Sequence, residues 1–154
     1  MAARSPHIRM RDVSRVYDAL ELGIIIADGN GTIIWGNRYY SSLAQFDIRD
    51  YFGQNVRKIS QREDVILPTE RYMIDTVLET RQQQTQIVRY PTQDYVLTTA
   101  TPILNKAGEI DYIIYSVSNY SDLMRLQEKA SQSTMRAMAL ESHLRNIQVD
   151  SSIG

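Results

Sequence analysis

The hydrophobic positions near the start of the chain follow two different periods. Between residues 8 and 22 the apolar side chains recur at helical spacing, and they are Val13, Val16, Tyr17 and Leu20. This spacing predicts an amphipathic helix. Two β-branched runs follow, residues 23–28 and 32–36, and an Asp-Gly-Asn-Gly sequence separates them. Because these turn residues tolerate a positive φ, the pattern predicts a β-hairpin.

A run of short helices is predicted after the hairpin. Asn37 stands at a helix N-cap position, where its side-chain oxygen accepts hydrogen bonds from free backbone N–H groups, so we expect a helix over residues 38–45. Residues 46–69 lack a clear period and suggest short helical turns around 48–52 and 56–59. Pro68 and Thr69 then predict the start of a helix that runs to residue 80.

The third quarter of the chain returns to a β pattern. We expect strands over residues 85–90, 95–104 and 110–118, separated by turn-forming sequences. The last strand carries apolar side chains on both faces: Ile113, Tyr115 and Val117 on one, Tyr112 and Ile114 on the other. Both faces of an antiparallel sheet are therefore expected to be covered. Helix, strands, short helices, strands and a long helix together predict one α+β domain.

The tail repeats its apolar positions in alternating steps of three and four. The eight positions of this seam are Leu123, Leu126, Ala130, Ser133, Ala137, Leu140, Leu144 and Ile147. A helix packed on its own domain would drift from a 3.5-residue repeat, so the seam predicts a two-chain coiled coil over residues 121–148. The small residues in the middle predict weak pairing there. The expected homodimer interface combines the seam with the N-terminal helix, through Val13, Val16, Leu20, Leu123, Leu126, Ala130, Ala137, Leu140 and Leu144.

Composition limits the function classes. The 154 residues carry a net charge of -1, which predicts neither nucleic acid nor membrane as a partner, and no apolar run approaches the ~20 residues that span a bilayer. The expected location is therefore the cytoplasm. The chain has no cysteine, which excludes disulfides, thiolate zinc sites and sulfur-linked cofactors. We expect residues 1–8 to be disordered, residues 9–120 to form the domain, and residues 149–154 to be a linker to an output domain outside this sequence.

Two segments resemble the PAS domain family. Residues 22–37 resemble its opening hairpin and helix-capping asparagine, and Thr99-Ala100-Thr101-Pro102-Ile103 with Ala107-Gly108-Glu109-Ile110 resembles its fourth strand and following turn. The resemblance spans about residues 16–120 and implies a sensory domain with a five-stranded antiparallel sheet and short helices on one face. In many members the last strand ends in an Asp-Ile-Thr-like signature, where this chain has Asn119-Tyr120-Ser121.

A looser similarity concerns the parent protein. The helix over 69–80, the third strand and the tail at 145–151 resemble the sensor region of sigma-54-dependent transcription activators. In that family a PAS domain precedes an ATPase domain and a DNA-binding domain, which implies that this chain signals through its coiled coil to a transcription-regulatory output. Two alternatives stay open: a ligand-free dimerisation scaffold, and the input domain of a sensor histidine kinase.

No catalytic or metal site is predicted. The only histidines are His7 and His143, at the start and in the tail, so they share no pocket with each other and the chain is not expected to be an enzyme. The PAS resemblance implies an internal pocket, for which the candidate lining residues are Tyr40, Met73, Val77, Arg89, Leu97, Thr99 and Tyr115. A buried Arg89 would favour a carboxylate ligand, whereas the alternative is that it points to solvent.

Two missing residue types limit which cofactors such a pocket can bind. The 69–80 helix has no histidine to ligate haem, and no cysteine exists to bind flavin covalently. No cofactor is evident, and a small organic metabolite is the expected ligand. The remaining possibility is a core filled by its own apolar side chains.

Overall fold

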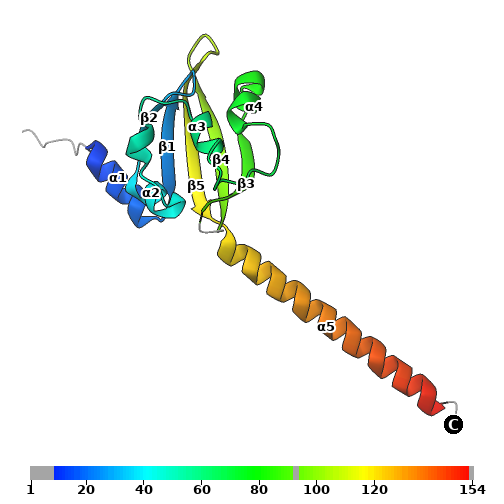
Figure 1. Cartoon of the computed structure of the whole chain (residues 1–154). Coiled ribbons are helices and arrows are strands. Elements are labelled where there is room, and N and C mark those ends of the chain that lie inside the picture. The colour runs from blue at the N-terminus through cyan, green and yellow to red at the C-terminus, as the bar shows by residue number, and fades with distance from the viewer. Residues whose placement is uncertain (1–8, 92–93, 153–154) are drawn as a thin grey trace, which may run out of the picture. The chain divides into compact units, whose positions relative to one another are not determined.

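The computed structural model describes residues 9–91 and 94–152. The chain divides into two units, a globular part that ends at Tyr120 and a helical part that starts at Ser121. Figure 1 shows the sheet and short helices of the first unit and the single long helix of the second. No helix in the described part of the chain has the length and apolar character needed to cross a lipid bilayer.

Five antiparallel strands form the sheet in the order β2-β1-β5-β4-β3. Their bounds are β1 Gly23–Asp28, β2 Ile33–Gly36, β3 Gln84–Arg89, β4 Tyr95–Leu104 and β5 Ile110–Asn119. β1 pairs with β5 along its whole length, so the N-terminal hairpin joins the three C-terminal strands in one sheet. The predicted α+β class and five-stranded antiparallel sheet are confirmed.

The helices follow the predicted order, with different bounds. They are α1 Met10–Ala19, α2 Arg38–Ala44, the 3-10 helix η1 Ile48–Tyr51, α3 Arg57–Ser60, α4 Met73–Thr80 and α5 Ser121–Ser152. α4 begins four residues later than Thr69, the predicted start. Ile66, which precedes α4, forms an isolated antiparallel bridge with Arg89 at the end of β3. This bridge holds the chain around Ile66 in an extended conformation. The helix therefore starts only after the chain has left the sheet edge.

The β1–β2 hairpin and the N-cap of α2 form as the sequence predicts. Asp28 Oδ1 accepts hydrogen bonds from the backbone N–H groups of Asn30 and Thr32, both at 2.9 Å, and Gly31 has a φ of +87° in the turn. Asn37 Oδ1 accepts from the N–H groups of Ile24 at 2.8 Å and Tyr40 at 3.3 Å.

Asn37 also ties the sheet to the segment before it. Its Nδ2 donates to the carbonyl oxygen of Leu22 at 2.8 Å. This one buried side chain therefore caps α2 and fixes the start of β1.

One face of the sheet carries the core. The buried side chains of alternate strand positions pack against α2, η1, α3 and α4, and they include Ile25, Ala27, Val88, Val96, Ala100, Ile113 and Val117. The opposite face exposes Ile34, Ile103 and Tyr112. The expectation that both faces are covered is therefore wrong for the single chain, because all of these helices pack on the same face.

Candidate functional site

A cavity of about 50 Å³ lies between the inner face of the sheet and the helices α2, α3 and α4. Most of its wall is apolar, with Ile25, Val56, Ile59 and Ile74 among the residues that line it. The polar side chains in the wall are Ser60, Gln86, Thr98 and the tyrosines Tyr40, Tyr72, Tyr90 and Tyr115. None of the described residues that line the cavity carries a charge.

Three of the polar side chains come from adjacent strands. Thr98 of β4 lies directly opposite Gln86 of β3, and Tyr115 of β5 lies opposite Ala100, two residues further along β4. Side chains two residues apart on a strand point to the same face. The register therefore places Gln86, Thr98 and Tyr115 as a polar strip across the wall of an otherwise apolar cavity.

Two hydroxyl groups of this strip have no hydrogen-bond partner among the described residues. They are Thr98 Oγ1 and the phenol oxygen of Tyr115, and their residues are only 8% and 5% exposed. A buried hydroxyl without a partner costs roughly 1–3 kcal/mol. Such groups mark a place where a hydrogen-bonding molecule would be stabilised.

The ionisation of Tyr115 is set by its surroundings. Burial raises the pKa of Tyr115 well above its usual value; the nearby Arg57 lowers this pKa in part, and Asp75 raises it. The phenol is therefore neutral at physiological pH. A neutral phenol can donate one hydrogen bond and accept others.

The other two deep tyrosines are paired with each other. The hydroxyl oxygens of Tyr40 and Tyr90 lie 2.9 Å apart, and their rings meet edge to face at a centroid distance of 6.1 Å. Burial raises the pKa of Tyr90 to about 12, and the hydrogen bond with Tyr40 opposes this rise in pKa. Both side chains are buried and line the cavity, so this pair contributes polar groups that already satisfy each other.

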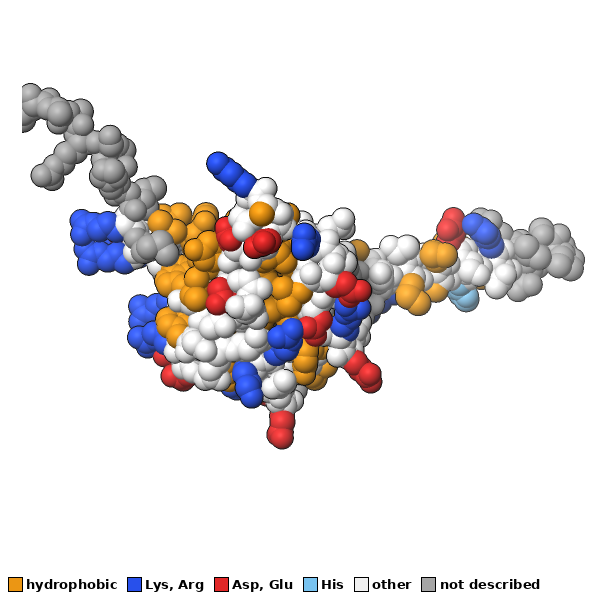
Figure 2. Space-filling model, turned by 90° about the horizontal axis from the view of Figure 1, so that it is seen from above, with side chains coloured by type: hydrophobic (Ala, Val, Ile, Leu, Met, Phe, Trp, Pro, Cys, Tyr) orange, Lys and Arg blue, Asp and Glu red, His pale blue; other side chains and the backbone are white. Residues whose placement is uncertain are grey.

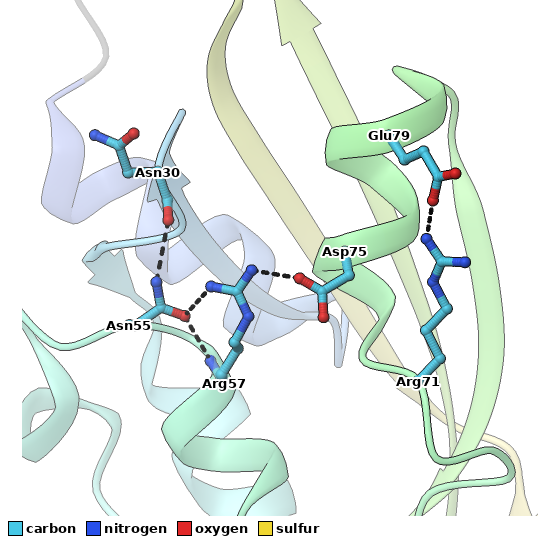
Figure 3. A network of polar contacts seen from close by, with 6 residues as sticks. All are labelled: Asn30, Asn55, Arg57, Arg71, Asp75 and Glu79. Carbon is cyan, nitrogen blue, oxygen red and sulfur yellow. Dashed lines mark hydrogen bonds and ion pairs between the residues drawn. The ribbon is translucent and has the colours of Figure 1, made fainter.

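A polar network joins the helices beside the cavity (Figure 3). Asn55 Nδ2 donates to the carbonyl oxygen of Asn30 in the hairpin turn at 3.0 Å, and Asn55 Oδ1 accepts from the backbone N–H and the guanidinium of Arg57. The same guanidinium forms an ion pair with Asp75 of α4. This network connects the β1–β2 turn, the start of α3 and the first turn of α4. Figure 3 also shows a second, separate ion pair, between Arg71 and Glu79.

The structure brings together some of the predicted pocket residues. Tyr40, Met73 and Tyr115 line the cavity. Val77 is fully buried in the core on α4, but it is not among the residues that line the cavity.

Arg89, Leu97 and Thr99 point to the opposite face of the sheet, so the prediction that they line the pocket is wrong. The buried positions of β4 are Val96, Thr98 and Ala100, which leaves the odd-numbered residues of this stretch on the outer face. Thr99 Oγ1 lies 3.2 Å from the hydroxyl of Thr85 on that face.

Arg89 lies opposite Tyr95 in the ladder, and its guanidinium lies over the Tyr95 ring, 5.3 Å from the centroid.

Sequence reasoning missed Thr98, Gln86 and Tyr90 as cavity residues. No local pattern marks Thr98 as inward-facing, because Leu97 on the outer face is as apolar as Val96 on the inner one.

The predicted dimer residues lie largely open in the single chain. On α1, Val16 and Leu20 are exposed while Val13 is half-buried. Among the seam residues, the exposed ones are Leu126, Ala130, Ser133, Ala137, Leu140, Leu144 and Ile147, whereas the side chain of Leu123 lies outside the described set. Figure 2 shows hydrophobic side chains open on the surface of the globular unit.

The sequence model of the PAS fold matches residues 17–120, and the chain belongs to the PAS family. No curated protein matches the chain by sequence. Among solved structures, an RNA-binding Light-Oxygen-Voltage receptor is similar at 15% identity and a TM-score of 0.59, over 88% of this chain and 41% of the receptor. This chain thus spans less than half of that receptor's length.

Two isolated domains show the same fold. The PAS domain of a protein from Colwellia psychrerythraea is 14% identical, with a TM-score of 0.54 over 73% of this chain and 98% of that domain. The PAS domain of the fruit-fly ELK potassium channel is 11% identical, with a TM-score of 0.52 over 75% of this chain and 99% of that domain. At these identities the similarity establishes the fold.

Proposed function

We propose that this chain is a sensory module that dimerises through α5 and reports the occupancy of its core cavity to an output domain. One observation carries the proposal: the strand that supplies Tyr115 to the cavity wall is also the strand that leads into α5. A molecule that binds Tyr115 would act on β5 itself. Because α5 continues from β5 along the chain, a change in the strand alters the start of the helix.

A backbone hydrogen bond to β4 fixes the residue that follows β5. The backbone N–H of Tyr120 donates to the carbonyl oxygen of Tyr95, the first residue of β4, at 2.7 Å. A ligand that shifts β4 against β5 therefore changes the geometry of the residue that precedes α5. Such a signal requires two arrangements of similar free energy, between which the ligand selects.

The seam of α5 supports pairing with a second copy of the chain. α5 has 32 residues, and every described side chain from Arg125 to Ile147 is exposed. An isolated helix gains its stability mainly by burying an apolar face. A second α5 offers an identical seam, and each leucine that it buries contributes roughly 2 kcal/mol.

The output that we propose is a domain that regulates transcription. This part of the proposal comes from the resemblance of residues 69–80 and 145–151 to the sensor region of sigma-54-dependent activators. In this role the chain acts as a sensor and performs no catalysis, and it contacts its output domain through α5 rather than binding nucleic acid itself.

A dimerisation scaffold without a ligand is the second candidate. The cavity volume of about 50 Å³ favours it, since pockets for drug-sized ligands usually measure roughly 300–1,000 Å³. In this case water would bind the unpaired hydroxyls of Thr98 and Tyr115, and the two α5 helices would stay paired permanently.

The oligomeric state tests the proposal with two matched variants. Leu140 lies in the seam of α5, and Met135 lies on the opposite side of the same helix; both side chains are exposed in the single chain. We expect the parent chain and Met135→Glu to be dimers by light scattering, and Leu140→Glu to raise the dimer dissociation constant at least about tenfold. A parent chain that is monomeric at tens of micromolar, or two variants that behave alike, would contradict the proposal.

A further inference from the structure

Three features of the cavity restrict the chemistry of its ligand: its size, its charge and its unpaired hydroxyl groups. The volume of about 50 Å³ exceeds the roughly 10–15 Å³ that one water molecule requires, but it lies far below the roughly 300–1,000 Å³ of pockets for drug-sized ligands. A ligand that enters without displacing the walls is therefore a small molecule of a few non-hydrogen atoms. Larger metabolites would require α3 or α4 to move.

The walls offer no counter-charge to an ion. The polar groups that line the cavity are hydroxyls and the Gln86 amide. Arg57, whose charge acts on Tyr115, is already paired with Asp75. An unpaired carboxylate that enters such a site loses its hydration and gains no counter-charge, so its binding is disfavoured.

The hydroxyls of Thr98 and Tyr115 specify what a ligand has to offer. Both residues are more than nine-tenths buried, and neither hydroxyl has a partner among the described residues. They come from adjacent strands at diagonal positions on the same face of the sheet, and both line the cavity. A molecule that carries both a donor and an acceptor can pair with these two hydroxyls, whereas Tyr40 and Tyr90 already satisfy each other.

Resting on the proposed function, we propose that the cavity binds a small neutral molecule that accepts a hydrogen bond from Tyr115 and exchanges one with Thr98, and that it rejects carboxylates. The ligand class is that of compact amides and similar neutral molecules with both a donor and an acceptor. This specificity differs from that expected for a pocket with an inward arginine, because Arg89 lies on the other face of the sheet.

Formamide and formate provide a matched test, because they have the same number of heavy atoms and differ in charge. Binding to the full 154-residue chain is followed by NMR shifts of the backbone amides of β4 and β5 in a titration to 200 mM. We expect formamide to bind at least about tenfold more tightly than formate. Equal binding, tighter formate binding, or no formamide binding at 200 mM would overturn the proposal; the last result would leave the site to water alone.

Two pairs of conservative variants locate the interaction. Thr98→Val and Tyr115→Phe remove the cavity hydroxyls, and each is expected to weaken formamide binding about tenfold. Thr99→Val and Tyr112→Phe remove hydroxyls from the outer face and are expected to leave the affinity unchanged. Affinity that is unchanged in both cavity variants would refute the site.

The same samples separate this inference from the proposed function. Light scattering on each titrated sample reports whether the chain is a dimer. Formamide binding by a monomeric chain would contradict the proposed function and support the ligand class. A stable dimer that binds formate as well as formamide would contradict the ligand class alone.

Discussion

The buried hydrogen bond between Tyr40 and Tyr90 predicts how the stability of the fold responds to alkaline pH. Burial raises the pKa of Tyr90 from 10.0 to about 12, and the hydrogen bond with Tyr40 lowers this pKa in part. The pKa of Tyr40 also lies well above its usual value, chiefly through burial and then through the proximity of Tyr90. The folded state therefore favours the neutral phenols.

The sign of the effect follows from the direction of the shift. Below pH 10 the phenol of Tyr90 is neutral in both the folded and the unfolded chain, so its contribution to stability is fully present. Between pH 10 and pH 12 the unfolded chain loses this proton first, and the free energy of unfolding falls. The loss for Tyr90 alone is about 1 kcal/mol at pH 11 and approaches about 3 kcal/mol above pH 12.

Urea unfolding between pH 8 and pH 11.5 tests this prediction with Tyr90→Phe. At pH 8 the variant is expected to lose about 1–2 kcal/mol, because the Tyr40 hydroxyl loses its partner. Its stability should then fall less steeply with pH than that of the parent, by about 1 kcal/mol at pH 11. Tyr112→Phe, at an exposed position, serves as the control. Parallel curves for the parent and Tyr90→Phe would refute the reasoning.

Two further predictions concern the polar groups that join the elements. Asn37→Ala removes the α2 cap and a buried tie to the start of β1, so urea unfolding should show a loss of about 3 kcal/mol; a loss below about 1 kcal/mol would contradict this role. Arg57→Gln should lower the free energy of unfolding by about 1 kcal/mol in the same assay. The side chains of Arg57 and Asp75 are only 30% and 39% exposed, and Arg57 also binds Asn55. Arg71→Gln is the matched control, whose more exposed pair predicts a smaller loss, and an equal loss would contradict the argument.

The sequence predicts the elements of this fold because their signals are local. The Asp-Gly-Asn-Gly turn, Asn37 and the β-branched runs each depend on contacts within a few residues, and the structure has the hairpin, the cap and the five strands. The start of α4 was predicted four residues too early because it depends on a distant contact. The bridge between Ile66 and Arg89 joins residues far apart in the sequence, and no local pattern indicates it.

The cavity was harder to predict than the fold. Tyr40, Met73 and Tyr115 were identified as residues that line it, but the face of β4 was assigned one residue out of register. A shift of one residue moves a side chain to the other face of a sheet. Leu97 and Thr99 alternate along β4 with Val96, Thr98 and Ala100, so each face of the strand carries both apolar and hydroxyl side chains. Hydrophobicity alone therefore does not distinguish the two faces.

Cross-linking through single cysteines tests the pairing of two α5 helices most directly. The chain has no cysteine, so each engineered thiol is the only one present. Ser133 lies in the seam, whereas Ser131, two residues earlier and about 200° away around the helix, faces solvent in a parallel pair. Ser133→Cys is expected to oxidise to a covalent dimer at micromolar concentration, since a seam position brings the two Cα atoms within about 7 Å, and Ser131→Cys is expected to stay mostly monomeric on denaturing gels. Equal and slow cross-linking at both positions would show that the seams do not meet and would contradict the account.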